Sequence, residues 1–266
     1  MKAKKSLGQN FLKSTSILKK IVSTGGVLAT DLVLEIGPGK GALTRKILDT
    51  GARVIAVEKD RELIPILKEE FKKEIKNKKL TLIEGDILDL DLKKIGVEKK
   101  KYKLVANIPY YITGAIIRKF LSGKTKPEKI VLLVQKEVAE RIVARDGRES
   151  ILSMSVKAYG DPKYIDKVPK RYFSPEPRVD SAILLIDNIS NKKLRAKDED
   201  TFFDIIHVGF GHKRKVLKNN LQKVLPKDII DDFWGKNQLS ATIRAEELEL
   251  KHWLLLLESF NSHKRL

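Results

Sequence analysis

The chain has 266 residues, of which 42% are hydrophobic and 33% are charged, and it contains no cysteine. This length suits one or two domains with a sizeable core. The lack of cysteine excludes disulfides, Cys-ligated zinc, iron–sulfur clusters and a thiol nucleophile. Lysine and arginine outnumber aspartate and glutamate by 54 to 35, giving a net charge of +19. Such an excess favours a polyanionic partner over a merely lysine-rich, solvated surface.

No stretch approaches the roughly 18–20 uncharged apolar residues of a membrane-spanning helix. Residues 1–5 are basic but lack the apolar region of a secretory signal. We therefore expect a soluble cytoplasmic protein that does not enter a membrane. The four histidines are a thin supply for a metal site, and we expect none.

Between about residues 32 and 186, short apolar runs alternate with longer amphipathic stretches. Strands are predicted at 32–36, 53–58, 80–84, 102–107, 129–134 and 181–186, the last as an edge strand, and helices at 42–48, 62–71 and 136–143. Alternation of strands and helices predicts a mostly parallel sheet with helices on both faces.

The pattern changes after Asp187. Residues 188–197 are polar and are predicted to form a linker. Helical spacing follows at 202–209, 215–225, 227–234 and 245–260, interrupted by proline and glycine. We therefore predict an α/β domain over 1–187 and a small all-α domain over 188–266.

A glycine-rich segment, Glu-Ile-Gly-Pro-Gly-Lys-Gly-Ala-Leu-Thr at 35–44, ends the first predicted strand and begins the first helix. Gly37 and Gly39 let the backbone turn tightly and let a ligand approach main-chain N–H groups. The spacing matches a dinucleotide-binding fingerprint, with Glu58 placed to accept ribose hydroxyls. The same layout serves S-adenosylmethionine, so at this point both cofactors remain open.

Asp86 and Ile87 follow the third predicted strand. The carboxylate can accept a hydrogen bond from an adenine amino group, and the isoleucine can pack on the ring. Ligands of such sheets bind at the carboxyl ends of the strands. The glycine loop, Glu58 and Asp86 at three successive strand ends therefore predict a nucleoside cofactor.

The segment Asn107-Ile108-Pro109-Tyr110 ends the fourth predicted strand. An exocyclic purine amine is a poor nucleophile because its lone pair is delocalised into the ring. The Asn107 side-chain oxygen and the carbonyl of Ile108 or Pro109 can accept its two N–H groups and localise that lone pair, while Tyr110 stacks on the base. The remaining requirement is alignment with the methyl group, so the tetrapeptide predicts methylation of a base amine.

A second aromatic candidate is Phe173, in the sequence Phe-Ser-Pro-Glu-Pro at 173–177. Two prolines stiffen this loop, and an enzyme that acts on a base must first take it out of its stack. Phe173 is predicted to close the other face of the target base.

Together these motifs resemble the KsgA-type rRNA adenine N6,N6-dimethyltransferases. The resembling segments are 7–12 (Leu-Gly-Gln-Asn-Phe-Leu), 35–44, 107–110, 135–139, 173–181, 210–217 and 243–248. The resemblance covers nearly the whole chain. It implies a Rossmann-like class I methyltransferase domain and a helical C-terminal domain, acting on two adjacent adenosines in a hairpin loop near the 3′ end of small-subunit (16S) rRNA during ribosome biogenesis.

The resemblance also implies roles for individual residues. Asn10 and Leu12 would contact S-adenosylmethionine near its methionine end, and Gly37 and Gly39 would line the loop. Glu58 would bind the ribose, Asp86 with Ile87 the adenine, and Asn107 would touch both cofactor and target. Asn107, Pro109, Tyr110 and Phe173 would form the catalytic site. The implied partner is the precursor of the small ribosomal subunit, and we expect a monomer.

Some positions depart from the family pattern, notably Tyr111, where asparagine is frequent. The sequence leaves three alternative functions open. The Erm group methylates large-subunit rRNA and shares the tetrapeptide, but Pro38 and the segment 42–44 favour the small-subunit enzyme. A non-catalytic RNA-binding factor on the same fold is opposed by the intact Asn107. An NAD-dependent oxidoreductase would leave the tetrapeptide and the charge unexplained. Residues 212–215 (His-Lys-Arg-Lys) form the local basic patch we single out for RNA contact.

Overall fold

The computed structural model describes residues 4, 7–212 and 215–263. The described chain divides into two compact units, one of residues up to 139 together with 160–189, the other of 140–159 together with residues from 190 on. This differs from the predicted ranges 1–187 and 188–266 in placing residues 140–159 with the C-terminal helices. The predicted domain ranges stay a prediction.

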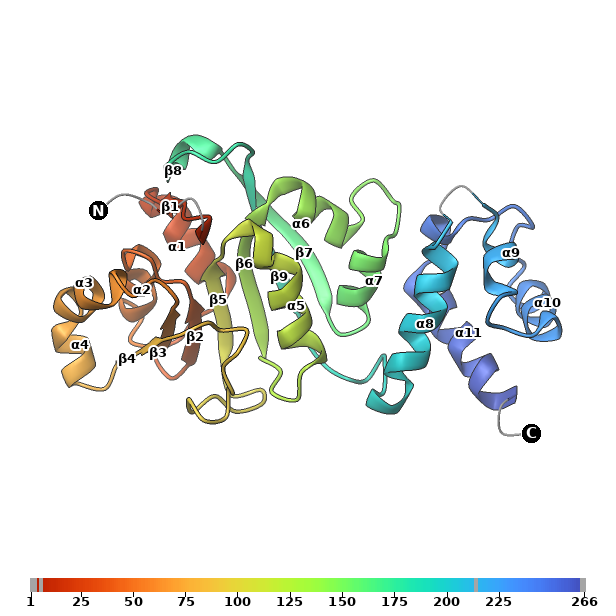
Figure 1. Cartoon of the computed structure of the whole chain (residues 1–266), viewed down its shortest axis with the longest axis horizontal. Helices are drawn as coiled ribbons and strands as arrows, with labels where there is room; N and C mark the ends of the chain where they lie inside the picture. Colours follow the sequence, from red (N-terminus) through yellow and green to blue (C-terminus); the bar gives the residue numbers. More distant parts are fainter. Residues whose placement is uncertain (1–3, 5–6, 213–214, 264–266) are drawn as a thin grey trace. The chain divides into compact units, whose positions relative to one another are not determined.

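Among the described residues, the larger unit contains a seven-stranded sheet in the order β4-β3-β2-β5-β6-β9-β7 (Figure 1). Its strands are β2 (Leu32–Ile36), β3 (Arg53–Glu58), β4 (Leu80–Glu84), β5 (Lys103–Asn107), β6 (Lys129–Gln135), β7 (Asp161–Val168) and β9 (Ser181–Asp187). The strands β4, β3, β2, β5 and β6 are parallel to one another, and β9 is antiparallel to both β6 and β7. The predicted mostly parallel α/β fold is confirmed.

The central strands are buried along almost their whole length, as expected for a sheet covered on both faces. The helices that pack on one face are α1 (Thr15–Thr24), α2 (Ala42–Leu48), α3 (Leu63–Glu70) and α4 (Lys72–Lys76). Their apolar side chains, such as Ile21, Ile47 and Leu67, form one core cluster with Val54 and Val105 of the sheet. Two further helices are α5 (Thr113–Ser122) and α6 (Lys136–Val143).

The predicted edge strand at 181–186 is not an edge. It forms β9, which lies between β6 and β7 and is buried from Ser181 to Ile186. The actual edge strand is β7, whose residues are mostly half-buried and whose sequence begins Asp161-Pro162-Lys163. A proline and charged side chains are typical of an edge, and they obscure the apolar alternation by which strands are recognised.

A separate two-stranded antiparallel sheet joins β1 (Phe11–Leu12) to β8 (Phe173–Ser174). Phe11 is paired with Ser174 and Leu12 with Phe173. This pairing brings the N-terminal motif next to the proline-rich loop, although more than 150 residues separate them in the chain.

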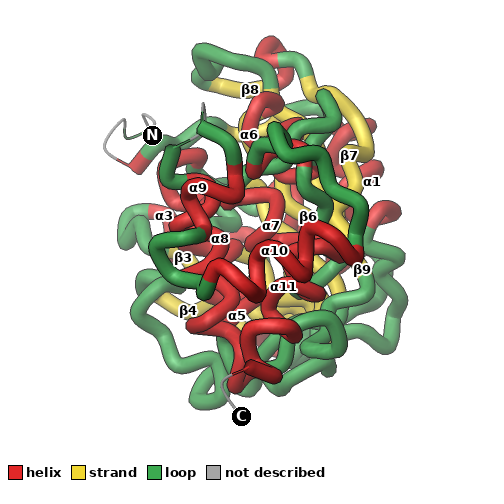
Figure 2. The backbone as a smooth tube through the Cα atoms, turned by 90° about the vertical axis from the view of Figure 1, so that its right-hand side faces the viewer, coloured by secondary structure: helices red, strands yellow, loops and turns green. Residues whose placement is uncertain are grey.

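In the second unit, every regular element within the described residues is a helix (Figure 2). The α-helices wholly within this unit are α7 (Ile151–Lys157), α8 (Glu199–Phe210), α9 (Leu217–Leu221), α10 (Lys227–Lys236) and α11 (Leu250–His263). Trp253 is fully buried and stacks on Phe210 at 5.6 Å between ring centroids. Gly209 leaves room for that indole, since a Cβ atom there would lie 2.4 Å from the Trp253 ring.

The predicted helix over 245–260 divides in two: a 3-10 turn at Ala245–Glu247 precedes α11. Two residues of the basic patch, Lys213 and Arg214, lie outside the described residues. Within the described chain, none of the helices combines the length and apolar character needed to cross a membrane.

Candidate active site

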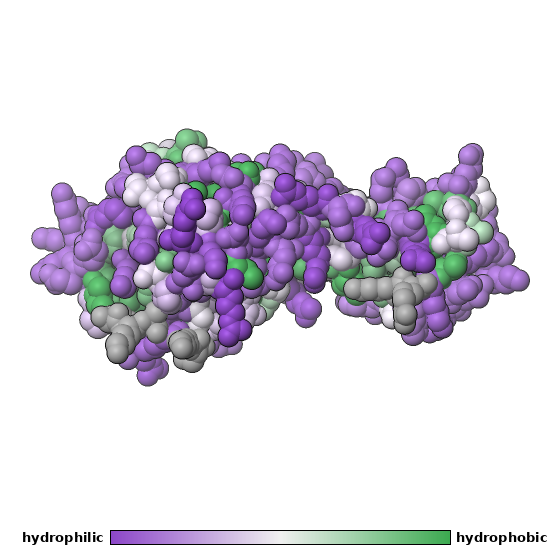
Figure 3. All heavy atoms as spheres, turned by 90° about the horizontal axis from the view of Figure 1, so that it is seen from above, coloured by the Kyte–Doolittle hydropathy of each residue, from purple (hydrophilic) through white to green (hydrophobic). Residues whose placement is uncertain are grey.

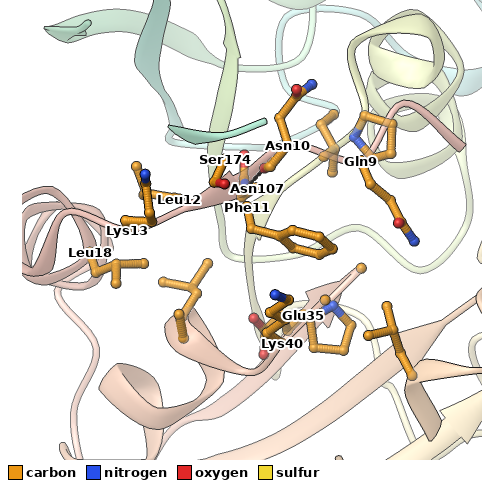
Figure 4. Close-up of a pocket in the computed structure, with 18 of the residues that line it drawn as sticks. Gln9, Asn10, Phe11, Leu12, Lys13, Leu18, Glu35, Lys40, Asn107 and Ser174 are labelled. Carbon is orange, nitrogen blue, oxygen red and sulfur yellow. Dashed lines mark hydrogen bonds between the residues drawn. The ribbon is translucent and has the colours of Figure 1, made fainter. Parts of the chain in front are cut away.

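A pocket of about 560 Å³ lies where β2 and β5 end. The N-terminal segment 8–13, the glycine loop and the tetrapeptide 107–110 all contribute to its walls (Figure 4). Of the predicted site residues, those that line it are Asn10, Leu12, Gly37, Gly39, Glu58, Asn107, Pro109 and Tyr110. A smaller cavity of about 60 Å³ shares Gly37, Glu58 and Pro109 with it and is also lined by Asp86 and Ile87.

The glycine loop turns through left-handed backbone conformations at Gly37, Gly39 and Gly41, with φ of +64°, +61° and +81°. Side chains rarely adopt these values. A Cβ atom at Gly41 would lie 2.4 Å from the Phe71 ring, so this glycine permits helix packing. At Gly37 nothing lies within 4 Å of the corresponding position. Gly37 therefore leaves open space on the side of the pocket.

Glu58 ends β3 and is 6% exposed. Its Oε2 accepts the N–H of Gly39 at 3.0 Å, and its Oε1 accepts the N–H of Asp60 at 2.8 Å. Burial raises the pKa of this carboxyl group, while the two backbone donors oppose the shift. Each oxygen retains a second lone pair, so Glu58 can still accept hydrogen bonds from ligand hydroxyls.

Asp86 follows β4 at the smaller cavity. Its Oδ2 is 2.7 Å from Lys59 Nζ, and its Oδ1 accepts the N–H of Leu88 at 2.9 Å. The hydrogen bond from Lys59 holds the pKa of Asp86 below its ordinary value. The side chain is therefore an ionised acceptor beside the buried Ile87.

Asn107 ends β5, and its Nδ2 donates to the Asn10 carbonyl at 3.2 Å. Because the amide nitrogen is engaged, the Asn107 oxygen is the atom left to accept a hydrogen bond from a target. The Tyr110 hydroxyl lies 2.6 Å from Ser181 Oγ, which fixes the phenol ring at the pocket wall. Burial raises the pKa of Tyr110, so the phenol stays neutral.

Phe173 is not part of either cavity wall. It is 2% exposed and belongs to the hydrophobic core cluster that also contains Leu12. Its neighbour Ser174 lines the pocket instead. In this structure the ring packs in the core, and its stacking on a target base stays a prediction.

No motif in the sequence marks Glu35 as a functional residue. It lines the pocket yet is only 1% exposed, and its Oε2 has no hydrogen-bond partner in the part of the chain that the structure describes. Burial raises its pKa to about 8. The feature that could have identified it from the sequence is an ionisable residue inside the otherwise apolar strand Leu32–Ile36.

The unfolding free energy is expected to depend on the protonation of Glu35. In the unfolded chain the carboxyl group loses its proton near pH 4.5, whereas the folded protein retains it up to about pH 8. The folded state therefore binds more protons in this interval, and stability falls as the pH rises from 4.5 to 8. Urea unfolding of wild type and Glu35→Gln at pH 5 and pH 8 should show a smaller fall in the variant. Equal falls would contradict the assignment, since other titrating groups are common to both proteins.

Phe11 and Lys40 also line the pocket although neither was predicted there. Figure 4 shows the Phe11 ring projecting into the pocket above the glycine loop. Lys40 Nζ lies 5.1 Å from the ring centroid, within cation–π range. A Cβ atom at Gly39 would lie 3.0 Å from this ring, so close contact of Phe11 with the loop requires glycine there.

The two adjoining cavities suit S-adenosylmethionine, which joins a nucleoside to an amino acid through a sulfonium. Glu58 and Asp86 supply carboxylate acceptors for hydroxyl and amino groups, and Ile87 supplies an apolar surface. Gly37 leaves the space that a ligand needs, and Glu35 holds a buried oxygen without a partner among the described residues. No cluster of three potential metal ligands occurs in the described ranges.

The family model for ribosomal RNA adenine dimethylase matches residues 1–262. The chain is 42% identical over 255 residues to ribosomal RNA small subunit methyltransferase A of Dehalococcoides mccartyi strain CBDB1, covering 95% of this chain and 87% of that protein. It is 37% identical over 263 residues to the protein of the same name from Alkaliphilus oremlandii strain OhILAs, covering 96% and 91%.

Two solved structures are similar to this chain over almost its whole length. A dimethyladenosine transferase from Plasmodium falciparum has a TM-score of 0.81 and 28% identity, covering 96% of this chain and 98% of that one. The 23S rRNA methyltransferase ErmE has a TM-score of 0.79 and 25% identity, covering 95% and 100%. The family model spans nearly the whole chain, and the cavities at the strand ends hold the family's motif residues; this protein is therefore a member of the ribosomal RNA adenine dimethylase family.

Proposed function

We propose that this protein transfers methyl groups from S-adenosylmethionine to N6 of two adjacent adenosines in the 3′-terminal hairpin loop of 16S rRNA, giving N6,N6-dimethyladenosine during ribosome assembly. The observation that carries the proposal is the position of Asn107 and Tyr110. Both face one pocket together with the glycine loop, in a chain of the rRNA adenine dimethylase family.

The chemistry follows from the atoms at this pocket. S-adenosylmethionine supplies an electrophilic methyl group when it is bound. Asn107 Oδ1 and the carbonyl of Ile108 or Pro109 accept the N–H groups of the target amine and leave its lone pair directed at that methyl group. Ser181 holds the Tyr110 hydroxyl, so the phenol ring can fix the plane of the base. Positioning supplies most of the rate, and the proton leaves to water after transfer.

The small subunit is favoured as substrate over large-subunit rRNA. The relatives at 37–42% identity carry a small-subunit name, whereas the structure of a 23S enzyme is 25% identical. The net charge of +19 suits an RNA partner, and Figure 3 shows a face on which hydrophilic residues predominate. We further propose a cytoplasmic monomer, because both cavities are lined entirely by residues of the larger unit. The relatives named above are bacterial, and bacteria assemble their ribosomes in the cytoplasm.

The direct test is methyl transfer from labelled S-adenosylmethionine to small subunits that lack this modification, with large-subunit rRNA in parallel. We expect dimethyladenosine only in the small-subunit sample, identified by mass spectrometry of digested nucleosides. Product only in large-subunit rRNA would place the protein with the Erm group instead. Cofactor binding without product in either sample would favour a non-catalytic assembly factor.

A further inference from the structure

Asp60 is a buried carboxylate two residues beyond Glu58. Its side chain is 1% exposed. Oδ2 accepts a hydrogen bond from Gln9 Nε2 at 2.7 Å, and Oδ1 accepts one from Lys4 Nζ at 2.7 Å. A charge this deeply buried is tolerated only with such partners. Asp60 lines neither cavity, so any influence on the site must act through a neighbour.

That neighbour is Gln9, which lines both cavities. Both ends of its amide are engaged: Nε2 donates to Asp60, and Oε1 accepts the backbone N–H of Lys4 at 2.8 Å. The next residue, Asn10, accepts the hydrogen bond from Asn107. The acceptor is the Asn10 backbone carbonyl, whereas the Gln9 side chain makes the bond to Asp60. The segment is thus held on one side to Asp60 and on the other to the catalytic tetrapeptide.

Asp60 is also tied to the predicted ribose acceptor. Its backbone N–H donates to Glu58 Oε1 at 2.8 Å. Burial raises the pKa of Asp60, but the hydrogen bonds from Lys4 and Gln9 outweigh it and keep the pKa below its ordinary value. The carboxylate is therefore ionised at neutral pH. Asp60, just after β3, therefore contacts both Glu58, the predicted ribose acceptor, and Gln9 of the N-terminal segment.

The N-terminal segment is held to Asp60 mainly by Gln9 rather than by Lys4. Lys4 is one-third exposed and also pairs with the exposed Glu62, and solvent-exposed ion pairs contribute little. The Asp60–Gln9 hydrogen bond is charge-assisted and sheltered on the carboxylate side, where loss of the partner is costly.

We propose that Asp60 is a positioning residue that, through Gln9, holds residues 7–12 across the cofactor pocket, so that Asn10 and Leu12 are in place to bind S-adenosylmethionine. The proposal rests on the function proposed above. It predicts that the amide–carboxylate pair, rather than either side chain alone, determines cofactor affinity.

The proposal can be tested by exchanging the amide and the carboxylate between positions 9 and 60. Gln9→Glu places two carboxylates opposite each other and loses the bond. Asp60→Asn leaves one neutral oxygen in place of two charged ones, so it cannot accept from Gln9 and Lys4 on separate oxygens, and any bond that remains to Gln9 is no longer charge-assisted. In the double variant the amide introduced at position 60 can donate to one oxygen of the carboxylate introduced at position 9. The other oxygen of that carboxylate still accepts from the Lys4 N–H. Glu62→Gln is the matched control, because it removes a carboxylate from the same ion-pair cluster.

Two measurements are required. Hydrogen–deuterium exchange of peptides containing residues 7–12, in protein without cofactor, should be faster in both single variants and return toward wild type in the double variant. The dissociation constant for S-adenosylmethionine, measured by calorimetry, should rise about 10-fold or more in the single variants. It should recover by most of that factor in the double variant, with Glu62→Gln unchanged throughout.

Single variants with wild-type exchange and affinity would overturn the proposal. So would a double variant that is no better than the singles, because that result indicates a general loss of stability. Wild-type protein that fails to bind S-adenosylmethionine would overturn the proposed function instead. The exchange data on protein alone would still decide whether Asp60 holds the segment.

Discussion

Replacement of Asn107 by alanine is expected to slow methyl transfer to small subunits by about 100- to 1,000-fold, the range seen when one preorganised hydrogen-bonding group is removed from an active site. The side-chain oxygen is the acceptor that localises the lone pair of the target amine, and no other side chain of the tetrapeptide can replace it. Cofactor binding should be weakened far less than the rate, because only the bond to the Asn10 carbonyl is lost while the glycine loop, Glu58 and Asp86 are unchanged. Initial rates with labelled S-adenosylmethionine, together with calorimetric cofactor binding, measure both effects.

Asn77→Ala is a suitable control, because Asn77 is exposed just after α4 and lines neither cavity. This variant should retain the wild-type rate. An Asn107→Ala enzyme that also retained the wild-type rate would show that the catalytic assignment of Asn107 is wrong. Loss of cofactor binding together with activity would instead assign Asn107 mainly to the cofactor.

Gly37→Ala is expected to weaken S-adenosylmethionine binding about 10- to 100-fold, since a methyl group forced into an occupied space costs about 1–3 kcal/mol. Gly37 leaves open space at the pocket, so the added methyl group meets the ligand rather than the protein. The positive φ of +64° adds a folding cost of about 1–2 kcal/mol. Calorimetric titration and urea unfolding separate the loss of affinity from the loss of stability.

Gly26→Ala is the matched control for this prediction. Gly26 also has a positive φ, +54°, and nothing lies within 4 Å of its missing Cβ, but it lines neither cavity. We expect a similar loss of stability with unchanged cofactor affinity. If Gly37→Ala binds the cofactor as tightly as Gly26→Ala does, the loop does not approach the ligand as proposed.

Much of the nucleotide-binding half follows from local pattern. The strands at 32–36 and 53–58 and the helix at 42–48 have the predicted bounds. Each strand is apolar at most of its positions, because both faces of a parallel sheet are buried. The edge strand β7 lacked this signal because its polar residues face solvent, and its absence from the prediction placed β9 wrongly at the edge.

The candidate site likewise contains residues whose positions local sequence predicts and residues whose positions it does not. The glycine loop, Glu58, Asp86 and the tetrapeptide could be predicted because each follows a strand, and parallel strands bring their carboxyl ends to one edge of the sheet. The packing of Phe173 could not be predicted in this way. Its sequence context suggested an aromatic surface for the base, whereas its packing in the core depends on pairing with Leu12 across the chain.

The sequence by itself determined the family, the α/β and helical parts, and the residue types available for cofactor and target. These depend on short-range periodicity and on motifs whose residues are near one another in the chain. Only the tertiary structure decided that Gln9 meets Asp60, that Asn10 meets Asn107 and that Phe11 covers Gly39. Such contacts join segments that are far apart in the chain, and they form only when the whole sheet has packed, because no local preference encodes a long-range contact.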